Sequence, residues 1–350
     1  MAAPISRRSF LSTTAVATAC GLGAKAVFAC PTGVAGPTVE DTFALRRAGK
    51  KIPVIFDTDI GNDIDDTWAL LMLLNSPELD VKLVASDHTN CTYRAKILAK
   101  MLEVCKRTDV PVGVGLKKGD ERAAQSDWVV DYDLDSYAGE VYEDGVDAII
   151  RTIRQSKDPI TLIAVGPVTN LPEVLRRAPD VAEKARFVGM HGSVRKGYAN
   201  SPKISPEWNV RADPPALQAV FAAPWEKTVT PLDTCGIVHL KDDRYAKVLG
   251  CQAPGTKALI ENYRIWTKWH EAQDRKMPDP SQRSSTLYDT VAIYLGYSED
   301  LVEMETHPLI VTDDGYTRID AKGHPARCAM AWKDLGGFEQ HLTERVTREG

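Results

Sequence analysis

Short apolar runs typical of buried strands alternate along this chain with segments of helical periodicity. The strand-like runs cover 52–56, 81–85, 111–114, 160–165 and 187–190, and the helical segments cover 65–74, 92–106 and 145–156. This alternation predicts an α/β fold: a Rossmann-like, mostly parallel (mixed) central sheet with helices on both faces. Sites in such sheets lie at the carboxyl ends of the strands. The strand ends that this rule selects are Phe56, Ala85, Val165 and Met190.

The first thirty residues have a different character from the rest of the chain. Arg7 and Arg8, followed by Phe10-Leu11, open a stretch of small and apolar residues that runs to Ala29. This pattern predicts a twin-arginine type signal peptide over 1–30, and therefore export to the periplasm. Two interpretations of its end remain open. In the first, cleavage follows Ala29. In the second, residues 27–30 loosely resemble a lipoprotein box, so that Cys30 is acylated and its lipid tethers the protein.

The remaining chain is predicted to form one domain. Residues 31–50 contain several prolines and glycines and are expected to be a linker, and 51–350 form a single domain of a size that can bury a large core. The signal segment is too short and too weakly apolar for a transmembrane anchor. The formal charge of −5 and the absence of basic tracts argue against a nucleic-acid partner.

Five aspartates crowd into ten residues directly after the first predicted strand. They are Asp57, Asp59, Asp63, Asp65 and Asp66, and Gly61 between them permits a tight turn. Carboxylates about 4 Å apart repel each other, so such a group needs protons, solvent or a cation. Oxygen ligands without nearby histidine or cysteine suit a hard cation such as calcium or magnesium. The alternative is a solvated acidic loop that caps the helix starting near Asp65.

The segment from Phe56 to Asp66 resembles the N-terminal signature of the inosine-uridine nucleoside hydrolase family, DTDxGxDD, with two extra residues before the final pair. Further segments resemble the family in the same order along the chain, over about 52–320. They are Thr89-Asn90, Gly166-Pro167-Val168-Thr169-Asn170, Met190-His191-Gly192, Glu207-Trp208-Asn209 with Asp213-Pro214, Leu232-Asp233-Thr234 and Tyr288-Asp289. The resemblance implies the nucleoside hydrolase fold.

The resemblance also implies the reaction and the metal. It implies calcium-dependent hydrolysis of the N-glycosidic bond of ribonucleosides, or of a related N-ribosyl compound, to ribose and free base. The side chains of Asp59, Asp66 and Asp289 and the backbone carbonyl of Val165 would hold Ca2+. Asp59 would activate a water on the metal. The resemblance implies Asp59, Asp65 and Asn90 as the catalytic residues.

The family pattern implies a small-molecule nucleoside as the partner and a homodimer or homotetramer as the assembly. Asp65 and Asn90 would hold the ribose hydroxyls, and Glu207 and Asn209 the 5′-hydroxyl, with Asn200 as a helper. The full implied set of substrate-binding residues is Asp65, Asn90, Trp128, Met190, Asn200, Glu207, Asn209, Tyr288 and Asp289.

The sequence departs from the family at the group that would protonate the departing base. Nonspecific members have a histidine immediately before the last aspartate, where this chain has Tyr288, and 118–137 contains no histidine either. Stacking of the base between tryptophans is an alternative, with Trp128, Trp208, Trp266 and Trp269 as candidates. Core packing is the favoured interpretation of Trp266 and Trp269. His270 is a candidate acid, although a surface histidine is the favoured interpretation.

Two rival functions remain at this stage. An exported ribose- or nucleoside-binding protein with altered or lost hydrolysis would account for the missing histidine. Against it stands the retention of Asp59, Asp65, Asp66, Asn90 and Asp289, because binding alone does not need a complete water-activating set. A phosphatase would need a lysine near its phosphate cradle, and 166–169 contains none.

Overall fold

The centre of the fold is strand β1 (Ile52–Thr58), which is buried along its whole length. In the computed structural model it lies between β2 (Leu79–Ser86) and β5 (Ile160–Ala164), and it pairs in parallel with both. Such a strand must be apolar on both faces, which explains its near-continuous hydrophobic sequence. Strand β1 ends in Asp57 and Thr58, so the acidic run begins inside the sheet.

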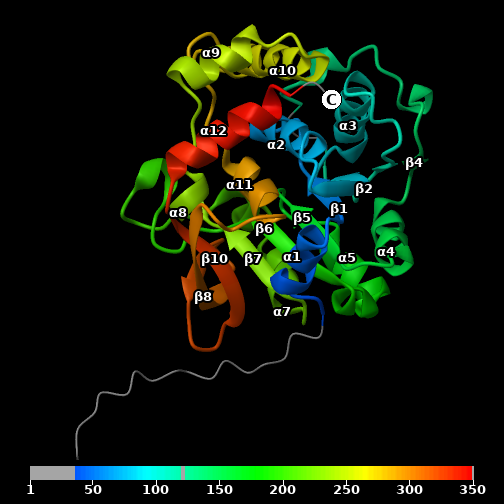
Figure 1. The fold of residues 1–350 in the computed structure, drawn as a ribbon, viewed down its shortest axis with the longest axis vertical. Coiled ribbons are helices and arrows are strands. Elements are labelled where there is room, and N and C mark those ends of the chain that lie inside the picture. The colour runs from blue at the N-terminus through cyan, green and yellow to red at the C-terminus, as the bar shows by residue number, and fades with distance from the viewer. Residues whose placement is uncertain (1–35, 120–122, 349–350) are drawn as a thin grey trace, which may run out of the picture. The chain divides into compact units, whose positions relative to one another are not determined.

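The sheet has ten strands in the order β4-β3-β2-β1-β5-β6-β7-β10-β8-β9 (Figure 1). Pairing is parallel from β4 to β10, whereas β8 pairs antiparallel with β10 and with β9. The other strands are β3 (Val112–Gly113), β4 (Val141–Tyr142), β6 (Ala185–Met190), β7 (Lys227–Thr230), β8 (Val302–Val311), β9 (Thr317–Ile319) and β10 (His324–Trp332). The predicted mostly parallel, mixed sheet is confirmed.

Helices cover both faces of this sheet. The α-helices are α1 (Val39–Arg47), α2 (Asp65–Leu74), α3 (Cys91–Val104), α4 (Gly145–Gln155), α5 (Leu171–Arg177), α6 (Trp208–Ala212), α7 (Pro214–Ala222), α8 (Leu232–Cys235), α9 (Asp242–Gly250), α10 (Pro254–Glu271), α11 (Tyr288–Leu295) and α12 (Leu335–Val346). Short 3₁₀ helices are η1 (Ser126–Trp128), η2 (Leu134–Ser136), η3 (Pro179–Glu183) and η4 (Tyr198–Asn200).

Two apolar cores follow from the alternation of side chains along the strands. Val54 and Phe56 of β1 point into a core shared with α2, α3, α10, α11 and α12, whereas Ile55 points into a core shared with α4, α5 and α7. The helices of the first core include α2 and α11, whose first residues carry Asp65, Asp66 and Asp289. The first core therefore fixes the position of the acidic side chains.

The structure describes residues 36–119 and 123–348. The predicted signal peptide over 1–30, with its alternative ends at Ala29 and Cys30, lies outside these residues and stays a prediction. Within the described ranges, no helix combines the length and the apolar character needed to span a membrane.

The linker expected over 31–50 is wrong in its second half, where the chain forms helix α1. Thr38 and Asp41 make a capping box at its start, in which each side chain accepts a hydrogen bond from the other residue's backbone N–H. The backbone N–H of Val39 donates to Glu226 at 2.7 Å, and Arg46 donates to the carbonyl of Tyr297 at 2.8 Å. Helix α1 is therefore attached to the sheet domain. The linker prediction relied on the prolines and glycines that precede this helix, and these do not extend into it.

Removing the capping box should lower the stability of the protein if α1 is part of the cooperative fold. Thr38→Ala removes a side-chain acceptor, so we expect the free energy of unfolding to fall by about 1 kcal/mol. Urea denaturation measures this, with the exposed α3 variant Thr92→Ala as the matched control. An unchanged free energy for Thr38→Ala would show that α1 unfolds independently of the domain.

Candidate active site

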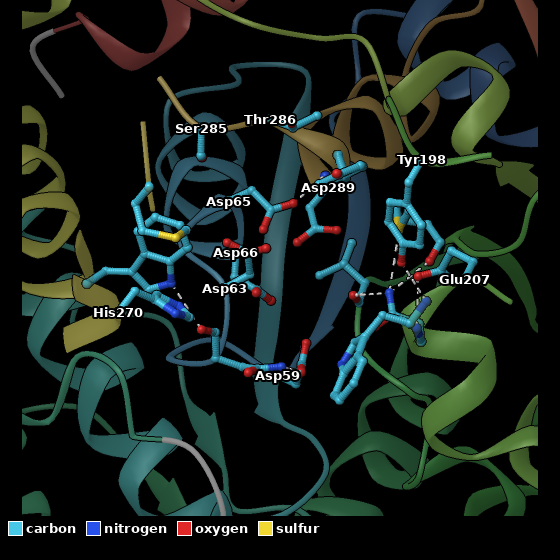
Figure 2. Close-up of a pocket in the computed structure, with 18 of the residues that line it drawn as sticks. Asp59, Asp63, Asp65, Asp66, Tyr198, Glu207, His270, Ser285, Thr286 and Asp289 are labelled. Carbon is cyan, nitrogen blue, oxygen red and sulfur yellow. Dashed lines mark hydrogen bonds between the residues drawn. The ribbon is translucent and has the colours of Figure 1, made fainter. Parts of the chain in front are cut away.

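A pocket of about 430 Å³ opens at the carboxyl ends of β1, β5 and β6 (Figure 2). The residues that line it are Asp59, Asn62, Asp63, Asp65, Asp66, Val165, Met190, Tyr198, Glu207, Trp208, Asn209, Trp266, His270, Arg275, Met277, Pro278, Ser285, Thr286, Tyr288 and Asp289. The loop after β1 and the first turns of α2 and α11 supply the carboxylates. This is the edge of the sheet that the strand pattern predicts.

Three carboxylates at the bottom of the pocket lie close enough together to hold one metal ion. Oxygens of Asp65, Asp66 and Asp289 all lie within 4.8 Å of one another, and each residue is at most 3% exposed. The backbone N–H of Asp289 donates to Asp65 at 3.3 Å, and the Thr58 hydroxyl donates to Asp66. These contacts join the helices α2 and α11 to the end of β1.

Burial and mutual repulsion make full ionisation of this triad costly. Burial raises the pKa of Asp66 and Asp289 well above the ordinary value, and the neighbouring carboxylates raise it further. The pKa of Asp65 is raised first by burial and then by Asp63. The alternative of a solvated acidic loop is therefore wrong for these side chains. Because the donors are all oxygens, the triad suits a hard cation that would neutralise them.

Asp59 stands beside the triad rather than in it. Its Oδ2 accepts a hydrogen bond from Asn62 Nδ2 at 3.2 Å and lies 4.0 Å from Arg94 Nη2. The family resemblance implies Asp59 as a ligand and Asp65 as a sugar contact, whereas the tightest carboxylate group contains Asp65. Asp63 is half-buried and lines the pocket.

A buried arginine of α3 fixes the loop that carries Asp59. Arg94 is 1% exposed, and its Nη1 donates to the backbone carbonyls of Asp59 and Ile60. Its Nε donates to the carbonyl of His88 at 3.0 Å, and its Nη2 donates to the Thr89 hydroxyl at 2.7 Å. One guanidinium thus joins the loops that follow β1 and β2, which is possible because its donors form a rigid fork.

Glu207 and Asn209 form one side of the pocket, at the start of α6. The Glu207 carboxyl accepts hydrogen bonds from the backbone N–H groups of Gly192, Asn209 and Val210. Burial raises its pKa to about 7, because these donors only partly offset the loss of water. Asn209 Nδ2 donates to the carbonyls of Val165 and Met190, at 2.8 and 3.0 Å. Val165, Met190, Glu207 and Asn209 all line the pocket.

Aromatic side chains surround the rest of the pocket. Trp266 and His270 come from the last turns of α10, and their rings meet edge to face with centroids 4.5 Å apart. Tyr288 meets Tyr198 edge to face, with centroids 6.2 Å apart. The expectation of a surface histidine is wrong, since His270 is 9% exposed and lines the pocket. Trp266 both packs in the core and lines the pocket.

Several residues that the sequence places in the site do not line this pocket. Asn90 caps α3 and accepts from the N–H of Tyr93 at 3.2 Å, and Asn200 is exposed in η4. Trp128 is buried and donates to Glu261 at 3.2 Å, with the Lys100 ammonium over its ring. Trp269 is half-buried and contacts the far side of His270. The proposed roles of these residues stay predictions.

Sequence reasoning missed other residues that line the pocket. They are Asn62, Tyr198, Arg275, Met277, Pro278, Ser285 and Thr286. Asn62 lies within the acidic run, so its position could have identified it. The residues from 275 to 286 lie in the connection between α10 and α11, which carries no strand or helix pattern that would place it over the site.

Known proteins match nearly the whole described chain. The family model described as inosine-uridine preferring nucleoside hydrolase matches residues 54–341. The pyrimidine-specific ribonucleoside hydrolase RihA of Escherichia coli is 30% identical over 327 residues, which cover 84% of this chain and 98% of that protein. The protein of the same name from an Enterobacter species is 29% identical over 240 residues, 63% of this chain and 73% of that protein.

Solved structures share the fold at lower sequence identity. A plant nucleoside hydrolase, PpNRh1, superposes with a TM-score of 0.70 at 22% identity, over 85% of this chain and 99% of that one. A purine-preferring ribonucleoside hydrolase from Gardnerella vaginalis superposes with a TM-score of 0.69 at 20% identity, over 84% and 98%.

The fold places an acidic pocket at the carboxyl edge of a parallel sheet, and the family match makes the protein a hydrolase. The chain belongs to the inosine-uridine preferring nucleoside hydrolase family, and it is an N-glycosyl hydrolase. The family match supports an enzyme over the rival binding protein.

Removing the Arg94 guanidinium should destabilise the protein strongly. Arg94→Met leaves the buried carbonyls of Asp59, Ile60 and His88 without these donors, so we expect a loss of about 3–5 kcal/mol in the free energy of unfolding. Urea denaturation measures it. The control is Arg151→Met, which removes an exposed ion pair with Asp147 and should cost less than about 1 kcal/mol. Equal losses in the two variants would contradict the role of Arg94.

The raised pKa of Glu207 predicts a pH-dependent stability difference. Glu207 has a pKa of about 7 in the folded state, against an ordinary value of 4.5. Between these two pH values the unfolded chain releases this proton and the folded chain keeps it, so the stability from Glu207 falls as pH rises. Relative to Glu207→Gln, wild-type stability should fall by about 3 kcal/mol across this range. Urea denaturation at a series of pH values tests this, and a constant difference would contradict it.

Proposed function

We propose that this chain hydrolyses the N-glycosidic bond of ribonucleosides to ribose and free base with the help of a calcium ion. The observation that carries the proposal is the triad of buried carboxylates, Asp65, Asp66 and Asp289, at the bottom of a pocket of about 430 Å³. Carboxylates held this close in a buried site need a positive charge among them, and a hard cation provides it.

The residues around the triad fit calcium. Calcium takes six to eight oxygen ligands, and Val165 lines the same pocket as the three carboxylates. When bound, Ca2+ would be coordinated by the 2′- and 3′-hydroxyl oxygens of ribose, and it would make a water molecule easier to deprotonate. Asp65 would combine two roles, since its carboxyl belongs to the triad and also lines the space open to the sugar.

Asp59 would take the proton from the attacking water. It lies in the same pocket, outside the triad, and Asn62 and Arg94 hold its carboxylate and its backbone. A general base needs a fixed position and a free acceptor atom, and both are compatible with this environment. The positive charge that develops on the sugar during bond cleavage would be stabilised by the surrounding carboxylates.

The sugar would lie between the triad and the Glu207–Asn209 side of the pocket. Glu207 would form a hydrogen bond with the 5′-hydroxyl. Near neutral pH its carboxyl can donate this bond when protonated or accept it when ionised. Met190 would pack against the sugar from the end of β6. The relative with 30% identity is named pyrimidine-specific, which favours uridine and cytidine as the first substrates to test.

Two variants separate the role of Asp59 from that of the triad. Asp65→Asn should weaken calcium binding and, with it, turnover. Asp59→Asn should retain calcium binding but lower turnover by about 10²–10⁴-fold, because the base is removed while the triad remains. Release of free base from uridine, cytidine, inosine and adenosine measures turnover, with and without a chelator.

Thermal unfolding of the same variants, with and without Ca2+, measures calcium binding. At 100 times its dissociation constant, Ca2+ should add about 2.7 kcal/mol to the stability of wild type and of Asp59→Asn. Asp135→Asn, an exposed change in η2, is the matched control and should behave as wild type. Calcium-independent base release, or none from any ribosyl substrate, would overturn the proposal. Loss of calcium binding in Asp59→Asn would instead place Asp59 among the ligands.

A further inference from the structure

The pocket has two opposed sides with the carboxylates between them. Figure 2 shows Glu207 and Tyr198 on one side, His270 on the other, and Asp65, Asp66 and Asp289 in the middle. Trp266 and Arg275 both contact the His270 ring. The two sides therefore offer different chemistry to the two ends of a bound nucleoside.

The chemistry of ribose assigns the base to the His270 side. In a furanose, C1′ carries the base and C4′ carries the 5′-hydroxymethyl group, and these carbons flank the ring oxygen on opposite sides. If the 2′- and 3′-hydroxyls face the triad and the 5′-hydroxyl lies at Glu207, the base must point toward Trp266 and His270. This step rests on the proposed function, because it takes its orientation of the sugar from there.

The imidazole of His270 is held in place by its neighbours. Its ring meets Trp266 edge to face at 4.5 Å and Trp269 at 4.9 Å between centroids. Trp266 is itself fixed, because its Nε1 donates to the backbone carbonyl of Asn62 at 3.1 Å. Arg275 Nη1 lies 3.5 Å from His270 Nδ1, at the outer limit of a hydrogen bond. A ring confined in this way presents its N–H edge at a defined position.

The other polar groups near the base are poorly suited to give up a proton. Burial raises the pKa of Tyr288 and Tyr198, so their hydroxyls are weak acids at neutral pH. Imidazole is the side chain that ordinarily changes its charge between pH 5 and 8. Arg275, Asp63 and Asp65 line the same pocket as His270.

We propose that His270 donates the proton taken up by the departing base. The C1′–N bond breaks and its electron pair passes to the base nitrogen, while a His270 N–H proton goes to a ring nitrogen of the base. The oxygen of the attacking water forms the new bond to C1′, and its proton goes to Asp59. Asp59 then releases a proton to solvent and His270 takes one up, so that water has been added across the C–N bond.

A substrate whose leaving group needs no proton tests this role. Nitrophenolate departs from p-nitrophenyl riboside as a stable anion, whereas uridine and inosine need help with the leaving base. His270→Ala and His270→Gln should lower kcat on the nucleosides by about 10²–10⁴-fold. The same variants should hydrolyse p-nitrophenyl riboside at nearly the wild-type rate. The matched control is His324→Gln, an exposed histidine of β10, which should leave both rates unchanged.

The two substrates also separate the ways in which this inference can fail. Equal losses on both substrates would overturn it, because His270 would then only position the sugar or support the fold. Unchanged kcat on the nucleosides would overturn it as well, since another group would supply the proton. If wild type hydrolyses neither substrate in the presence of calcium, the proposed function fails, and this inference fails with it.

Discussion

The mutual repulsion of buried carboxylates at the end of β1 is the constraint on which the site depends. Asp65, Asp66 and Asp289 are brought within 4.8 Å by two helices that also pack in the apolar core. Burial removes the water that would otherwise screen them, so their charge must be balanced from within the pocket. The core thus maintains a concentration of negative charge that gives the pocket its chemistry.

Balancing that charge uses residues from distant parts of the chain. Arg94 of α3 supplies a fixed positive charge behind Asp59, and backbone N–H groups around Glu207 partly stabilise another buried carboxyl. The proposed metal site and the proposed sugar side are therefore held by different parts of the fold. The triad lies in the first turns of two helices, α2 and α11. Glu207 and Asn209 lie at the start of one short helix, α6.

Local patterns in the sequence predict the parallel strands β1, β2, β3, β5 and β6 and the acidic run, because buried strands and crowded carboxylates each have a local signature. The antiparallel strands β8, β9 and β10 were not predicted, since their half-buried residues alternate weakly. The expectation of a surface position for His270 is wrong for another reason. Whether an aromatic ring lies in a core or a pocket depends on the neighbours that the fold brings to it, such as Glu261 beside Trp128.

Two hydrogen bonds connect the base side of the pocket to Asp59. Trp266 donates to the Asn62 backbone carbonyl, and the Asn62 side chain donates to the Asp59 carboxylate. A base that fits poorly against Trp266 would shift the indole, and the shift would reach Asp59, the residue proposed to deprotonate water. Selectivity among nucleosides would then be expressed in the rate of the chemical step as well as in affinity, so that an ill-fitting nucleoside could bind well and still react slowly.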